Sequence, residues 1–118
     1  MRRGLLAFSI LILTLAALAE THEVGIGDNF FDPDMVSISR GDRVRWTNEG
    51  AHTHRTKSFD GLWDSGFLDP GETYTRTFNT IGSFDYRDPQ YPYATGTVIV
   101  VSIGVEMTSW GRILSIYR

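Results

Sequence analysis

Residues 83–101, SFDYRDPQYPYATGTVIVV, join two segments of strand character through a stretch rich in proline and tyrosine. Phe84 and Tyr86 alternate with polar residues, the period of two that is typical of a half-buried strand. Residues 96–101 are almost continuously apolar, which is typical of a strand buried on both faces. Two prolines stiffen the connection between them. The stretch therefore predicts two strands of a β-sheet, linked by a loop of restricted shape.

The same alternation occurs earlier in the chain. In three places two apolar residues are separated by a single intervening residue: Val24 and Ile26, Val36 and Ile38, and Val44 and Trp46. The polar segments 51–58 and 73–78 are further strand candidates, and turn residues separate all of these segments. With 12 glycines and 13% aromatic residues, the pattern predicts an all-β fold: a two-sheet antiparallel Greek-key sandwich of about seven strands.

The amino-terminal segment has the features of a secretory leader. Residues 1–19 begin with two arginines after the first Met, continue as an uncharged apolar run and end in Ala-Leu-Ala before Glu20. This pattern predicts a cleaved signal peptide, and an uncleaved anchor is the alternative, although the apolar run is short for a membrane span. We expect a domain at 20–102 outside the cytoplasm, secreted, periplasmic or in the cell envelope. For the tail, 103–118, an edge strand, a short helix and a loose segment stay open.

Composition limits the possible functions. Removal of the leader leaves nine basic residues against 14 acidic ones, a net charge of −5, with no basic cluster to suggest nucleic acid. The chain has no cysteine, which excludes a disulfide, a thiolate nucleophile and a thiolate metal ligand. It also lacks the motifs of the common hydrolase, metalloprotease and nucleotide-binding sites, so we expect a protein that is not an enzyme.

Several phrases together resemble the cupredoxins, the family of plastocyanin-like and amicyanin-like blue copper proteins. They are VRWTNEG at 44–50, DSGFLDPG at 64–71, GSFDY at 82–86 and YPYATGTVIV at 91–100, with a histidine six residues after Asn48. The likeness extends over about residues 23–101. It implies the cupredoxin β-sandwich and a copper site at one end of it.

The resemblance also implies where the copper ligands would stand. In the short-loop members an upstream histidine is joined by a loop of the form Cys-x-x-His-x-x-Met. Aligned without a gap, Asp88 occupies the cysteine position, Tyr91 the histidine position and Ala94 the methionine position, and only His54 matches a ligand. A type 1 site needs a thiolate, two imidazoles and a weak axial thioether. We therefore expect no blue, electron-carrying copper centre and no resident cofactor, with copper left as an alternative.

Two interpretations of the remaining polar groups stay open. If the fold is kept, His54 and Asp88 face each other and, with Tyr91, offer a weak site for Cu(II) or Zn(II). Alternatively, Asp88 accepts backbone hydrogen bonds in a turn and Tyr91 caps the core. His52 and His54 form an H-x-H pair, which is either a chelating pair or an ordinary pair of solvated strand residues.

A second candidate metal site lies at the predicted mature amino terminus. Cleavage before Glu20 gives a chain that begins Glu20-Thr21-His22. A free amine, two backbone amides and the imidazole of His22 can enclose Cu(II) in a square plane, although a chance histidine before the first strand explains the same residues. The sequence thus predicts an exported binding or scaffold module with a degenerate copper site and an unidentified cell-envelope or secreted protein partner. The alternative is a copper-handling or electron-transfer-related protein that uses His54 with Asp88, or the amino-terminal site.

Overall fold

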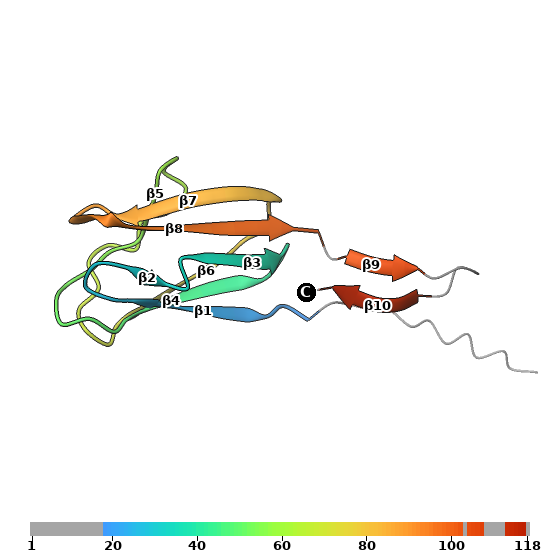
Figure 1. The fold of residues 1–118 in the computed structure, drawn as a ribbon, viewed down its shortest axis with the longest axis horizontal. Coiled ribbons are helices and arrows are strands. Elements are labelled where there is room, and N and C mark those ends of the chain that lie inside the picture. Colours follow the sequence, from blue (N-terminus) through green and yellow to red (C-terminus); the bar gives the residue numbers. More distant parts are fainter. Residues whose placement is uncertain (1–17, 103, 108–112, 118) are drawn as a thin grey trace, which may run out of the picture.

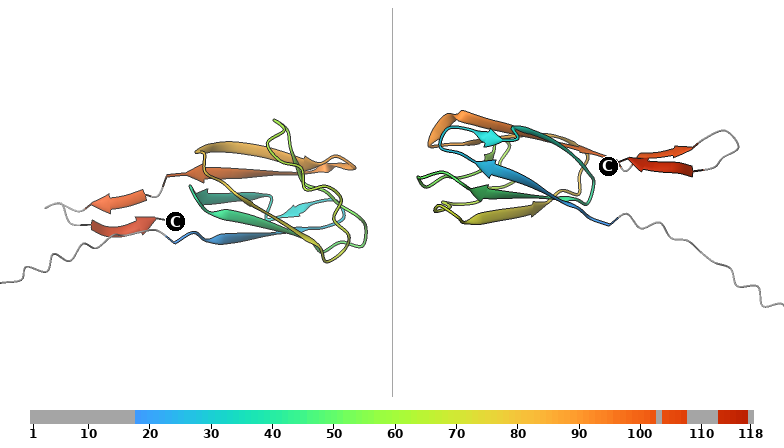
Figure 2. Two further views of the ribbon diagram at one scale, coloured as in Figure 1. Left: turned by 180° about the vertical axis from the view of Figure 1, so that it is seen from behind. Right: turned by 60° about the horizontal axis from the view of Figure 1, so that its bottom comes forward.

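The computed structural model describes residues 18–102, 104–107 and 113–117, and within these residues it contains strands and no helix. Two four-stranded sheets face each other (Figures 1 and 2). The first sheet has the order β2 (Phe31–Asp32), β1 (Thr21–Ile26), β4 (Arg43–Asn48) and β6 (Thr73–Thr77). The second has the order β3 (Met35–Ser39), β8 (Tyr91–Val101), β7 (Gly82–Asp88) and β5 (Lys57–Ser58).

The predicted all-β, two-sheet sandwich is confirmed, with eight strands in the two sheets. Neither sheet is antiparallel throughout. β1 runs parallel to β4 in the first sheet, and β3 runs parallel to β8 in the second. Each parallel pair places a strand from the first part of the chain beside one that comes later, which ties together segments far apart in the sequence.

The hydrophobic core fills the space between the sheets and follows the alternation seen in the sequence. Trp46 lies at its centre, fully buried, with ring centroids 5.6 Å from Trp63 and 5.3 Å from Tyr86. The other buried apolar side chains are Val24, Ile26, Phe31, Ile38, Val44, Leu68, Phe78, Ala94, Val98 and Val100. Burial of this surface supplies the main favourable term in folding.

Tyr86 of β7 and Gly96 of β8 are partners in the register of the second sheet. A side chain on Gly96 would place its Cβ 2.4 Å from the Tyr86 ring, so only glycine leaves room for the phenol. Burial raises the pKa of Tyr86 to about 12, and the phenol is therefore neutral at physiological pH.

The stiff loop of residues 89–95 is shorter than the sequence predicts. β7 ends at Asp88 as expected, but β8 already begins at Tyr91, so that Pro89 and Gln90 form a tight turn. Asp88 pairs with Tyr91, and the register shifts between Arg87 and Asp88. This shift marks a β-bulge, with more residues on β8 than on β7.

The strand expected at residues 51–58 is largely absent. Only Lys57–Ser58 forms a strand, and His54 makes an isolated bridge to Leu68. The physical reason is that side chains satisfy part of the local backbone: Asp28 Oδ1 accepts from the Ala51 amide and Ser65 Oγ accepts from the Thr56 amide, each at 2.9 Å. A segment whose amides are bonded in this way needs no neighbouring strand.

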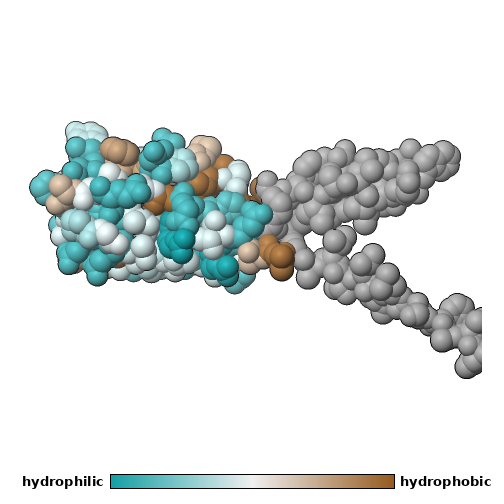
Figure 3. Space-filling view, turned by 90° about the horizontal axis from the view of Figure 1, so that it is seen from below, coloured by the Kyte–Doolittle hydropathy of each residue, from teal (hydrophilic) through white to brown (hydrophobic). Residues whose placement is uncertain are grey.

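Both ends of the chain carried predictions that the structure addresses only in part. The leader falls mainly on residues 1–17, outside the described residues. Among the residues that the structure does describe, no helix is long and apolar enough to cross a membrane. In the tail, β9 (Gly104–Met107) and β10 (Ile113–Tyr117) form an antiparallel two-stranded sheet beyond the end of β8 (Figure 1). The sandwich face shown in Figure 3 is mostly hydrophilic, with small apolar areas between polar ones.

Candidate functional site

The site predicted at the carboxyl end of β7 is centred on His54, which the backbone holds firmly. The His54 amide donates to the Leu68 carbonyl at 3.0 Å, and the Leu68 amide donates back at 2.7 Å. Asn48, at the end of β4, donates from Nδ2 to the carbonyls of His52 and Leu68, both at 2.8 Å. The segment that carries His54 is thus fixed to the end of the first sheet.

The His54 imidazole lies between two carboxylates. Its Nδ1 is 2.7 Å from Asp88 Oδ2 and its Nε2 is 2.8 Å from Asp28 Oδ1. The side chains of His54 and Asp88 are fully buried, and that of Asp28 is 40% exposed. Each ring nitrogen is thus hydrogen-bonded to one carboxylate oxygen. We call this carboxylate–imidazole–carboxylate arrangement the His54 network.

Asp88 receives donors on both of its oxygens. Besides His54, Oδ2 accepts from the Arg55 amide at 3.3 Å, and Oδ1 accepts from the Gln90 amide at 3.1 Å. The bond to Gln90 is the turn-type contact expected for an aspartate that precedes a Pro-X turn. Asp88 therefore makes the backbone contacts of one sequence interpretation and also faces His54, as the other interpretation required.

Asp28 belongs to the same network, and sequence reasoning did not identify it. Its Oδ1 also accepts from the amides of Ala51 at 2.9 Å and His52 at 3.3 Å. The hydrogen bond from His54 is the main cause that lowers the pKa of Asp28 below its usual value. Gly50 permits this approach, because a Cβ there would lie 2.3 Å from Asp28 Oδ1. In the sequence, Gly27-Asp28-Asn29 carries only a turn signal.

The residues at the start of β8 differ in their contacts and their burial. Tyr91 packs beside His54, with ring centroids 4.6 Å apart, and Ala94 is buried. Tyr93 is 91% exposed, so it does not cap the core. His52 is exposed in a turn whereas His54 is buried, and the two histidines therefore do not form a chelating pair.

This donor set does not fit a type 1 copper ion. Ala94 offers no donor atom, and the chain contains no thiolate. What the residues do offer is a network of side-chain hydrogen bonds around the buried His54.

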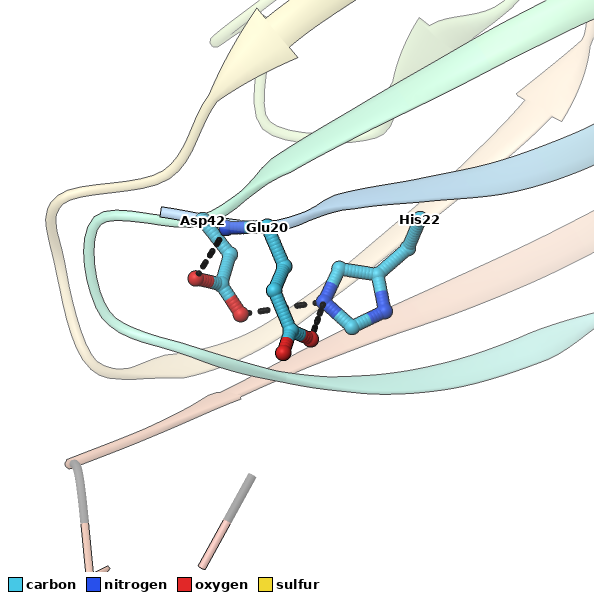
Figure 4. Close-up of side chains that lie close together, drawn as sticks. All are labelled: Glu20, His22 and Asp42. Carbon is cyan, nitrogen blue, oxygen red and sulfur yellow. Dashed lines mark hydrogen bonds and ion pairs between the residues drawn. The ribbon is translucent and has the colours of Figure 1, made fainter. Parts of the chain in front are cut away.

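His22 lies away from this network, at the other end of β1 and β4, and close to two acids (Figure 4). His22 Nε2 is 2.9 Å from Asp42 Oδ2 and 3.8 Å from Glu20 Oε2. The structure thus places the two candidate metal sites apart and adds Asp42 to the amino-terminal one.

Comparison with known proteins identifies relatives named amicyanin and plastocyanin. No family model matches the chain. Over 89 residues the chain is 34% identical to amicyanin-alpha of Methylorubrum extorquens, an alignment that covers 71% of this chain and 75% of that protein. It is 33% identical over 87 residues to a chloroplastic plastocyanin of Tetradesmus obliquus, covering 63% of this chain. The chain spans only 60% of the length of that plastocyanin.

Solved structures show the same fold at lower identity. A purple cupredoxin from Nitrosopumilus maritimus matches 68% of this chain and 99% of its own, with a TM-score of 0.65 and 24% identity. A copper(I) form of an amicyanin mutant matches 69% of this chain and 82% of its own, with the same TM-score and identity. The sequence relatives and the solved structures therefore come from the same group of proteins.

Proposed function

Because the chain belongs to the cupredoxin family, we propose that residues 20–102 act as an exported binding or scaffold module rather than as a blue copper electron carrier or an enzyme. Export is supported by the leader pattern of residues 1–19, which ends in a small-residue cleavage motif. The protein partner would accordingly be found in the cell envelope or outside the cell.

The observation that carries the proposal is the direct contact of His54 with Asp88. In a blue site the imidazole binds copper and a thiolate completes the chromophore. Here the corresponding imidazole nitrogen is bonded to a carboxylate at 2.7 Å, and its second nitrogen is bonded to Asp28 at 2.8 Å. Both ring nitrogens are used in holding the loops together, which supports a structural role for the former metal end.

Exposed aromatic residues near the same end support a protein partner. Phe30 follows Asp28 by two residues and is 57% exposed, and Tyr93, between Tyr91 and Ala94, is 91% exposed. Phe67 precedes Leu68, the backbone partner of His54, and is 59% exposed. Aromatic side chains presented on loops by a rigid scaffold are well suited to contact another protein.

The test is metal analysis with an absorption spectrum of the protein beginning at Glu20. We expect no intense visible band after addition of Cu(II), because that band requires a thiolate. A deep-blue protein would refute the proposal.

A second candidate function is weak copper handling at the same end, because His54, Asp88 and Tyr91 do lie together. It requires Asp88 to release His54 so that both can bind an ion. Copper that remains after dialysis of the wild type and is lost in His54→Ala, but not in His52→Ala, would favour this function. The exposed His52 provides the matched control.

A further inference from the structure

Glu20, His22 and Asp42 form a second cluster of metal-ligating side chains (Figure 4). One donor atom from each residue lies within 4.8 Å of the others. Glu20 and His22 are two residues apart, so they project from the same side of an extended chain. Asp42 directly precedes β4, which pairs in parallel with β1, and the Arg43 amide donates to the Glu20 carbonyl at 2.8 Å. The sheet itself therefore brings the three residues together.

The three side chains offer both a fixed ligand and an entry path. The Asp42 carboxylate is 2% exposed and is oriented by the amides of Ser39 and Glu20, each at 3.0 Å. His22 is 23% exposed and Glu20 is 49% exposed. A buried, oriented acid beside a partly open histidine and an open acid resembles a ligand set that an ion can reach from solvent.

Removal of the leader would add a fourth donor to this cluster. The Glu20 nitrogen lies 3.0 Å from Asp42 Oδ1. Cleavage after Ala19 would turn this amide into a free amine, and an amine is a nitrogen donor for the same ions that prefer imidazole. The amine donor rests on the proposed leader removal, whereas the three side chains do not.

We propose that the mature amino terminus binds one divalent late first-row ion, Cu(II) more tightly than Zn(II), through His22 Nε2, the carboxylates of Asp42 and Glu20, and the α-amine. A mixed nitrogen and oxygen donor set suits both ions, and Cu(II) stands above Zn(II) in the usual order of affinities. The separations of 2.9 and 3.8 Å between these donors require only small side-chain movements to meet bonds of about 2.0–2.2 Å.

This side-chain site differs from the square-planar chelate suggested by the sequence Glu20-Thr21-His22. That chelate wraps the deprotonated amides of Thr21 and His22 around the ion. In the structure these residues already pair with Arg43 and Val44 of β4, so the chelate would have to unpair the start of β1. The side-chain site leaves the pairing intact and is the only one of the two that uses Asp42.

The test is a Cu(II) titration of the protein beginning at Glu20, followed by calorimetry and by the nitrogen coupling in the electron paramagnetic resonance spectrum. We expect His22→Ala to weaken binding at least tenfold and to remove the imidazole coupling, because loss of even an outer-shell partner costs about 10–100-fold. His52→Ala is the matched control and should bind like the wild type. Glu20→Gln, at an exposed position, should also weaken binding without affecting folding.

Asp42→Asn separates the two geometries, with circular dichroism to check that the variant folds. Weakened binding in folded Asp42→Asn supports the side-chain site, and unchanged binding overturns it in favour of the backbone chelate. If Asp42→Asn does not fold, Glu20→Gln decides, since the backbone chelate does not need that carboxylate. Wild-type affinity in His22→Ala overturns both geometries. A blue spectrum would instead count against the proposed function, so the two failures are distinguishable.

Discussion

Replacement of Asp88 by asparagine tests the His54 network most directly. Three N–H donors converge on this carboxylate: His54 Nδ1 at 2.7 Å, the Arg55 amide at 3.3 Å and the Gln90 amide at 3.1 Å. Asparagine keeps the shape but has one acceptor oxygen and one NH2 donor. Whichever way the amide turns, at least one N–H donor faces the NH2 group.

The magnitude follows from these contacts. If the oxygen stays toward His54, the bond to the Gln90 amide is lost, at about 1 kcal/mol, and the bond to His54 loses the assistance of a carboxylate acceptor, at about 1–2 kcal/mol more. Removing one partner of a buried ion pair typically costs about 3–5 kcal/mol. We therefore expect Asp88→Asn to lower the free energy of unfolding by about 2–4 kcal/mol, a large part of the total stability of a domain of this size.

Urea denaturation followed by fluorescence of the buried Trp46 and Trp63 measures this loss. With a slope typical of a small domain, the midpoint should fall by about 2 M. Asp64→Asn is the control, because Asp64 pairs with Arg55 on the surface at 2.8 and 2.5 Å and exposed pairs contribute only about 0–1 kcal/mol. A loss for Asp88→Asn no larger than that of Asp64→Asn would refute the reasoning that the network stabilises this end.

Three further predictions follow from the same geometry. Gly50→Ala should cost about 1–2 kcal/mol in a urea titration, because its Cβ would lie 2.3 Å from an Asp28 oxygen and displace that acid from its histidine. The hydrogen bond from Arg55 is the main cause that lowers the pKa of Asp64 to about 2, so the small stabilisation by this pair is complete above about pH 4 and is lost as the pH falls through about 2. The difference in unfolding free energy between wild type and Asp64→Asn, measured from pH 6 to pH 2, should shrink over that window; a difference that is constant with pH would contradict it. The triple variant Asp88→Cys, Tyr91→His and Ala94→Met should turn blue with Cu(II), since it restores the thiolate, second imidazole and thioether; a colourless copper complex would show that the tight turn does not hold the ligand positions.

The alternation of apolar and polar residues was sufficient to predict several strands, because every second residue of a half-buried strand faces the core. Val24, Val44 and Trp46 are buried as their spacing requires. The predicted strand at 51–58 was wrong for a reason that no local pattern reveals. Some of its amides are hydrogen-bonded to the side chains of Asp28 and Ser65, and nothing in the segment itself distinguishes that case from pairing in a sheet.

The candidate site was predictable only as far as the family resemblance reached. It located His54 and Asp88 from their positions relative to other motifs, and the structure places the two side chains in contact. Asp28 was missed because it lies 26 residues from His54 along the chain, and its local signal is that of a turn. Asp42 was missed similarly, since only the parallel pairing of β1 with β4 places it beside His22.

The His54 network connects the loops at this end of the sandwich by hydrogen bonds. A metal ion in this position would connect the upstream histidine to the β7–β8 turn. Here His54 connects more of the chain: Asp88 brings in the turn after β7, Asp28 brings in the loop after β1, and the histidine itself is bound to Leu68 by the backbone. One imidazole ring thus joins segments from both sheets through hydrogen bonds to two carboxyl groups, and hydrogen bonds to ionised carboxylates are roughly twice as strong as neutral ones. Since the Asp88 carboxyl group also accepts two backbone amides, hydrogen bonds alone connect these segments.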